Sequence, residues 1–190
     1  GPGDRPPGWG MSSQPQRLVA ALDLGSTKVV AVIAEVTGDA RDPGAKILGL
    51  GVERSGGIRR GVVRDIEETT RAIDKAMKSA QRMAGVQVGS VYCGIAGEHV
   101  AGRSSHGMVS VTGDEIRTSD VARVNDMASN ISFGRDHELL HAIPQDYLID
   151  QQGGINEPIG MTGSRLEAEV YLVTVLSSVL QNLRKCVERA

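Results

Sequence analysis

The stretch LVAALDLGSTKVVAVIAEV, which runs from Leu18 to Val36, determines the fold expected for this chain. It contains two apolar runs, Leu18 to Leu22 and Val29 to Val36, on either side of the segment Asp23 to Lys28. Short β-branched runs flanking a turn predict two paired strands. Because the apolar residues are continuous rather than alternating, both faces of these strands are expected to be covered.

The segment between the two strands, DLGSTK, has the composition of a phosphate-binding turn. Gly25, Ser26 and Thr27 offer closely spaced backbone N–H groups with hydroxyl donors beside them. Lys28 adds a cation, and Asp23 is suited to holding Mg²⁺ through the water ligands of the ion. The same residue types are ordinary in a plain hairpin turn, and the GxxxxGK[ST] spacing of a Walker loop is absent. These residues alone leave both alternatives open.

Outward from this hairpin, the pattern predicts a third strand at Lys46 to Val52 and an amphipathic helix from Ile66 to Ala84. Asp65 is a good N-cap for this helix, and Gly85 ends it. After the helix, a first strand precedes elements in the order strand, helix, strand, strand, and a closing strand and helix follow. In sequence they are Ser90 to Ala96, Met108 to Val111, a helix capped by Ser119, Leu139 to Ile143, Tyr147 to Ile149 after an interruption at Pro144, Leu166 to Leu176, and a helix from Ser177 or Ser178.

Composition excludes several classes of protein. A net charge of -2 and 3% aromatic residues argue against nucleic-acid binding. No apolar run approaches the roughly 20 residues of a membrane-spanning helix. Two distant cysteines, Cys93 and Cys186, form neither a disulfide framework nor a zinc cluster, which favours the cytoplasm. Residues 1–16, with four of the seven prolines, are predicted to be a disordered tail or a cloning remnant.

The segment His137-Glu138-Leu139-Leu140-His141 matches the H-E-x-x-H pattern of zinc proteases. That chemistry needs both imidazoles on one face of a helix, together with a third ligand. Gly134 and Pro144 leave too little room for such a helix. A strand would place the two histidines on one face, about 13 Å apart, and so unable to share a zinc ion.

Several segments in order resemble the FtsA family of bacterial cell-division proteins. They are Asp23 to Lys28, Gly56 to Asp65, Ser90 to Gly97, His141 to Tyr147, Pro158 to Gly163, and the closing strand and helix. The resemblance spans residues 17–190 and implies an actin-like, ribonuclease H-like α/β fold with an inserted strand-helix-strand-strand module of the SHS2 type. It implies that 17–86 with 166–190 form an incomplete actin-type subdomain 1A, and that 87–165 form the inserted subdomain 1C.

The family's first phosphate loop matches Asp23, Gly25, Ser26, Thr27 and Lys28 of this chain. The resemblance therefore implies ATP and Mg²⁺ as ligands of the parent protein. It also implies that the parent tethers the FtsZ ring to the cytoplasmic face of the inner membrane, recruits later division proteins and self-associates into filaments. Family members are at most slow ATPases.

The family's second Asp-x-Gly hairpin, its FtsZ-binding subdomain and its C-terminal amphipathic membrane helix are not found in the chain. We therefore expect an amino-terminal fragment that is inactive alone, with no catalytic base of its own. Two other functions use the same superfold. One is a small-molecule kinase, which would need a catalytic Asp in its insertion; the other is an adaptor without nucleotide, as in pilus-assembly relatives.

Overall fold

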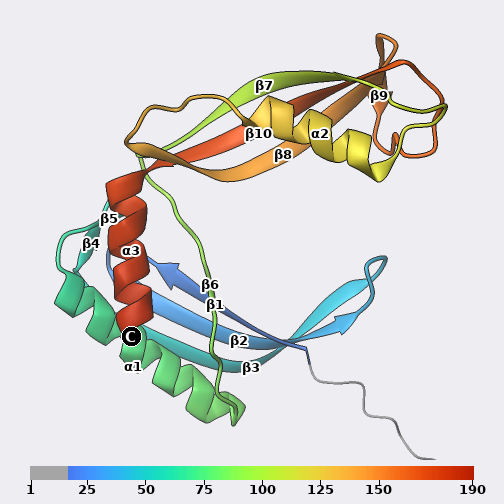
Figure 1. The fold of residues 1–190 in the computed structure, drawn as a ribbon. Coiled ribbons are helices and arrows are strands. Elements are labelled where there is room, and N and C mark those ends of the chain that lie inside the picture. Colours follow the sequence, from blue (N-terminus) through green and yellow to red (C-terminus); the bar gives the residue numbers. More distant parts are fainter. Residues whose placement is uncertain (1–16) are drawn as a thin grey trace, which may run out of the picture. The chain divides into compact units, whose positions relative to one another are not determined.

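The computed structural model describes residues 17–190, and the expected disordered tail at 1–16 lies outside the described residues. The chain divides into two compact units. The first contains residues 17–55 with Arg71–Gly94, and the second contains Gly56–Thr70 with Ile95–Ala190. Each unit is built around its own sheet (Figure 1).

The first unit contains a four-stranded sheet of order β3-β2-β1-β6. Its strands are β1 (Leu18–Leu24), β2 (Lys28–Gly38), β3 (Pro43–Arg54) and β6 (Tyr92–Cys93). The predicted hairpin is confirmed, because β1 and β2 pair antiparallel from Leu18↔Glu35 to Leu24↔Val29. The strand expected at Ser90 to Ala96 is only two residues long and pairs parallel with β1.

Helix α1 (Ile66–Ala84) has the predicted bounds. At its start, the Asp65 carboxylate accepts a hydrogen bond from the Glu68 backbone N–H at 2.9 Å, as an N-cap does. After its end, Gly85 adopts a φ of 69°, in the left-handed region that favours glycine. The ends of the helix are therefore encoded locally. Before the helix, the two-residue strands β4 (Ile58–Arg59) and β5 (Val62–Val63) pair with each other.

Only one face of the first sheet is fully buried. That face carries Ala20, Leu22, Val29, Ala31 and Ile33, all nearly inaccessible to solvent. On the opposite face, the large apolar side chains of β3 and β6 are 44–75% exposed: Ile47, Leu50, Val52 and Tyr92. The prediction that both faces are covered is therefore wrong for the described residues, although the sequence is apolar on both faces. We call this opposite side the exposed face.

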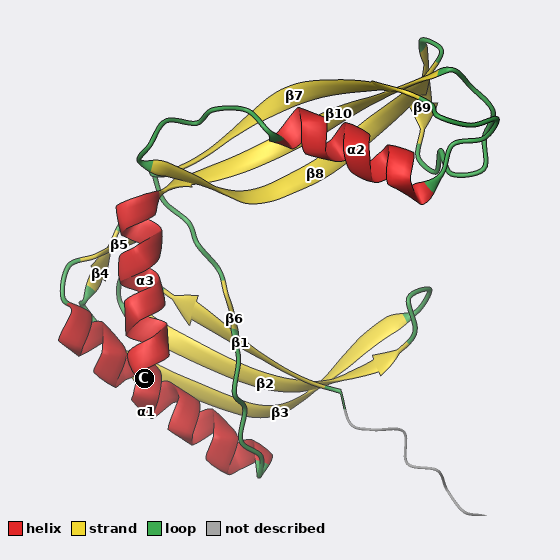
Figure 2. Ribbon diagram, viewed as in Figure 1, coloured by secondary structure: helices red, strands yellow, loops and turns green. Residues whose placement is uncertain are grey.

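The second unit contains an antiparallel sheet of order β7-β10-β8-β9. Its elements are β7 (Val100–Ser110), α2 (Thr118–Ser129), β8 (His137–Ile149), β9 (Gln152–Ile155), β10 (Arg165–Leu176) and α3 (Ser177–Arg189). Helix α2 lies across one face of this sheet (Figure 2). Between helix and sheet is a core that includes Val124, Leu166, Val170 and Leu172, each 0–1% exposed.

Three details of this unit differ from the sequence predictions. Strand β7 covers eleven residues, Val100–Ser110, whereas the sequence predicted a strand only at Met108 to Val111. Strand β8 continues through Pro144, because a register shift leaves Gln145 as a bulge beside the proline. The first turn of α2 is capped by Asp120, whose carboxylate accepts the Arg117 backbone N–H at 2.9 Å, and not by Ser119.

Candidate functional site

The candidate phosphate-binding site is the turn between β1 and β2. The Gly25 backbone N–H donates a hydrogen bond to the Lys28 carbonyl oxygen at 2.9 Å, which closes the turn around Ser26 and Thr27. A Cβ atom at position 25 would lie 3.0 Å from that same oxygen, so glycine fits the close approach of the two backbones. The turn is therefore tight and its geometry depends on Gly25.

The end of strand β3 holds this turn in place. The Ser55 backbone N–H donates to the Thr27 carbonyl oxygen at 3.0 Å. In the strand register, Lys28 lies directly opposite Arg54. Two cations are thus neighbours at one end of the sheet. No sequence motif links Arg54 to this turn; only the pairing of β2 with β3 brings it to the site.

The turn offers unused hydrogen-bond donors. Neither the Ser26 nor the Thr27 backbone N–H donates to a backbone carbonyl within residues 17–190. The side chains of Ser26, Thr27 and Lys28 are exposed. Adjacent free N–H groups, hydroxyls and an ammonium group can together bind a phosphate oxygen by charge-assisted hydrogen bonds.

Strand alternation places the charged groups of the site on one side of the sheet. Asp23 is opposite Val30, and Lys28 is two residues before Val30 on the same strand. Because side chains two residues apart on a strand point the same way, Asp23, Lys28 and Arg54 all lie on the exposed face. The structure therefore brings the predicted residues together, with Asp23 one step along the sheet from the turn.

Cys93 lies in β6 beside this site and is partly buried. Burial raises the pKa of its thiol, and the negative charge of Asp23 raises it further. A thiol with a raised pKa stays protonated at neutral pH and is a poor nucleophile.

The two histidines of the H-E-x-x-H segment both lie in strand β8. His137 is paired with Leu176 and His141 with Val173, and a register shift between them leaves Leu140 as a bulge. The bulge turns His137 and His141 toward opposite faces, so the prediction that they share one face is wrong. Across residues 17–190, no group of three or more His, Cys, Asp and Glu residues is arranged to hold a metal ion.

Comparison with known proteins gives consistent results. Residues 97–174 match the family model described as the SHS2 domain inserted in FTSA. The cell division protein FtsA of Pseudomonas aeruginosa is 42% identical over 178 residues, covering 94% of this chain and 42% of that protein. FtsA of Neisseria meningitidis is 40% identical, covering 93% of this chain and 42% of that protein, and FtsA of Escherichia coli (strain K12) is 36% identical, covering 92% and 41%.

The chain is homologous to FtsA over almost its whole length. It spans less than half the length of these FtsA relatives and corresponds to their amino-terminal part. The recognition of the family from the sequence is thus confirmed, as is an SHS2 module within the chain.

A solved structure supports the fold. The PilM-PilN type IV pilus biogenesis complex contains a chain that matches with a TM-score of 0.58 at 14% identity, covering 93% of this chain and 45% of that one. At this identity the similarity supports a shared fold alone, and it agrees with the actin-like class expected for an FtsA-family chain. None of the helices within residues 17–190 is both long and apolar enough to span a membrane.

Proposed function

We propose that this FtsA-family chain supplies one wall of an ATP-binding cleft in an actin-like cell-division protein. The observation that carries the proposal is the β1–β2 turn, with free N–H groups at Ser26 and Thr27 beside Lys28. Backbone N–H groups of the turn would hold phosphate oxygens and Lys28 would neutralise their charge. Asp23, exposed on the same face, would position Mg²⁺ through its water ligands.

The parent protein would act as the family does. It would tether the FtsZ ring to the cytoplasmic face of the inner membrane, recruit later division proteins and self-associate into filaments. We further propose that the chain divides into subdomain 1A, predicted from the sequence at 17–86 with 166–190, and the inserted subdomain 1C, predicted at 87–165, with one boundary moved. The pairing of β10 with both β7 and β8 favours an end of the insert near Leu176 rather than at 165.

The site is tested by titrating ATP into the full-length parent protein carrying Lys28→Ala. Loss of a charged hydrogen-bond donor costs about 1.5–3 kcal/mol, so we expect ATP affinity to fall by roughly 10- to 100-fold. Lys46→Ala is a matched control, because Lys46 is also an exposed lysine but lies far along β3 from the turn. Equal ATP affinity of Lys28→Ala and the parent would contradict the assignment. Transfer of phosphate from ATP to a sugar would favour the kinase alternative.

The exposed face supports the proposal that this chain is one part of a larger fold. Contiguous apolar surface of this kind marks a site that another segment covers. In this chain, Leu50→Lys is expected to leave the thermal midpoint nearly unchanged and to reduce binding of a hydrophobic dye. In the full-length parent, the same change is expected to destabilise, because the rest of the protein would cover Leu50.

The test compares the effect of Leu50→Lys on stability in this chain with its effect in the full-length parent. Met83→Lys is the control, since Met83 is 66% exposed but lies on helix α1 rather than on the exposed face. It should be tolerated in both chains. If Leu50→Lys were equally benign in the full-length parent, the remainder of the protein would not pack on this face.

A further inference from the structure

Strand β7 has a free edge. It pairs with β10 and with no other strand in the part of the chain that the structure describes. The Val111 backbone N–H donates to the Ser164 carbonyl oxygen at 2.9 Å. This bond identifies which residues of β7 are hydrogen-bonded to β10. Because hydrogen-bonded pairs alternate, the N–H and C=O groups of Ser104, His106 and Met108 point away from β10. An additional strand could pair with all of them.

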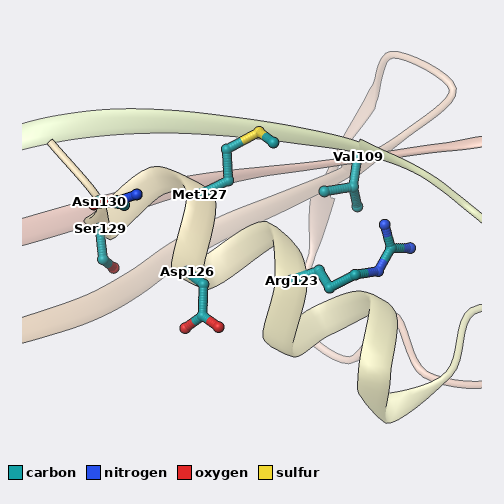
Figure 3. A pocket seen from close by; sticks show the side chains of 6 residues that line it. All are labelled: Val109, Arg123, Asp126, Met127, Ser129 and Asn130. Atoms are coloured by element: carbon teal, nitrogen blue, oxygen red, sulfur yellow. The ribbon is translucent and has the colours of Figure 1, made fainter.

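A groove runs beside this edge, between β7 and α2. It has a volume of about 700 Å³. Figure 3 shows the side chains that line it, which are Val109, Arg123, Asp126, Met127, Ser129 and Asn130. Met127 is 54% exposed and Val109 is buried, so the groove has an apolar part. Side chains on one face of a strand added to β7 would point into this groove.

One end of the free edge is already closed. The Arg123 guanidinium donates to the Ser110 carbonyl oxygen at 2.9 Å, and that carbonyl belongs to the outward-facing set. The same guanidinium is held by the buried carboxylate of Asp120 at 2.6 Å. An added strand would therefore stop before Ser110 and lie along residues 104–108. The contact also shows that the edge accepts hydrogen bonds from groups outside the sheet.

The face of the sheet opposite to α2 is acidic beside β7. Glu169 lies directly opposite His106 in the ladder, and Glu167 opposite Met108. Both carboxylates lie within 4 Å of the His106 imidazole. Arg165 contacts Glu167 at 3.5 Å and offsets part of this charge. Adjacent strands are about 4.8 Å apart, so an added strand would lie about 10 Å from β10, and an extended lysine or arginine side chain on it could reach across β7 toward the side chain of Glu169.

We propose that the free edge of β7 binds an extended segment of a partner protein by strand addition. The segment alternates apolar residues, which enter the groove beside Met127, with basic residues, which face Glu167 and Glu169. Backbone hydrogen bonds to Ser104, His106 and Met108 supply general affinity, and the two faces supply specificity. A second copy of the chain fits less well, because pairing β7 with itself would place the carboxylates of both copies on one face.

The probe is a seven-residue peptide of alternating lysine and leucine, titrated into the ¹⁵N-labelled chain. We expect the amides of His106 and Met108 to become protected from hydrogen exchange when the peptide is added. The amides of Gly107 and Val109 already face β10 and should gain little. A peptide with glutamate in place of lysine should bind about tenfold more weakly or worse. Protection spread evenly over β7, or equal binding of the glutamate peptide, would refute the proposal.

Variants separate the edge from the groove. Met108→Pro removes an outward N–H without removing a bond to β10, so the sheet should persist while peptide binding is lost. Met127→Glu should weaken binding through the groove, and Glu169→Lys through charge. Glu188→Lys, an exposed change on α3, is the control and should bind as the parent does. Strand addition by a partner would be overturned if Met108→Pro and Met127→Glu bound the peptide as well as the unmodified chain does. It would also be overturned if the free chain sedimented as a dimer and Met108→Pro abolished that dimer.

Discussion

Replacing Gly51 by valine is expected to destabilise the first unit by about 3 kcal/mol, the upper end of the usual cost of overpacking. A Cβ atom at position 51 would overlap the carbonyl oxygen of Ala76 in helix α1, and one at Gly49 would overlap that of Ala80. Helix and strand are therefore in backbone contact at both glycines. Valine could be accommodated only if α1 moved away from the sheet and opened the packing around Ala76 and Ala80, both fully buried.

Urea unfolding followed by circular dichroism measures this effect. Gly89→Ala is the matched control, because a Cβ atom at Gly89 meets nothing within 4 Å and its φ is not positive. That change should alter the free energy of unfolding by no more than about 0.5 kcal/mol. If the Gly51→Val variant were as stable as the unmodified chain, helix α1 would not lie against β3 at this glycine.

The sequence predicted the elements whose signals are local. The hairpin of β1 and β2 and the bounds of α1 follow from short apolar runs, an Asp at the helix start and a glycine after its end. Strand β7 was underestimated because VAGRSSHGMVS contains small and polar residues, which suit an edge strand but weaken an apolar pattern. The continuation of β8 past Pro144 depends on a bulge that no local pattern reveals.

The candidate sites show the same limit. The turn at Gly25 to Lys28 is contiguous, so its chemistry could be inferred from six residues. Arg54 reaches it only through the register of β2 with β3. The groove between β7 and α2 combines Val109 with Met127. The acidic surface on the other face of the sheet depends on β10 pairing with β7 across some 60 residues of sequence. Long-range pairing of this kind is set by tertiary packing, which sequence periodicity does not encode.

Replacing Asp120 by alanine is expected to lower the thermal midpoint of the second unit by several degrees. Its carboxylate is fully buried and accepts hydrogen bonds from the Arg117 backbone N–H and the Arg123 guanidinium. Alanine would leave that N–H without its partner and release the guanidinium, both costly near a buried helix end. Asp126→Asn on the same helix is the control, because Asp126 is exposed, and it should leave the midpoint unchanged.

The pH dependence of stability distinguishes the charge of Asp120 from its shape. The hydrogen bond from the Arg117 backbone, followed by that from Arg123, holds the pKa of Asp120 below its usual value. A carboxyl whose pKa is lower in the folded state stabilises the fold above its unfolded pKa of about 3.9, and this contribution is lost as the pH falls through the folded value. Asp120→Asn should therefore lower the midpoint at pH 7 but show a smaller further loss than the unmodified chain between pH 4 and pH 2. If the asparagine variant lost as much stability in acid as the parent, other carboxylates would account for the acid sensitivity of this unit, and the contact of Asp120 with Arg123 would add little to it.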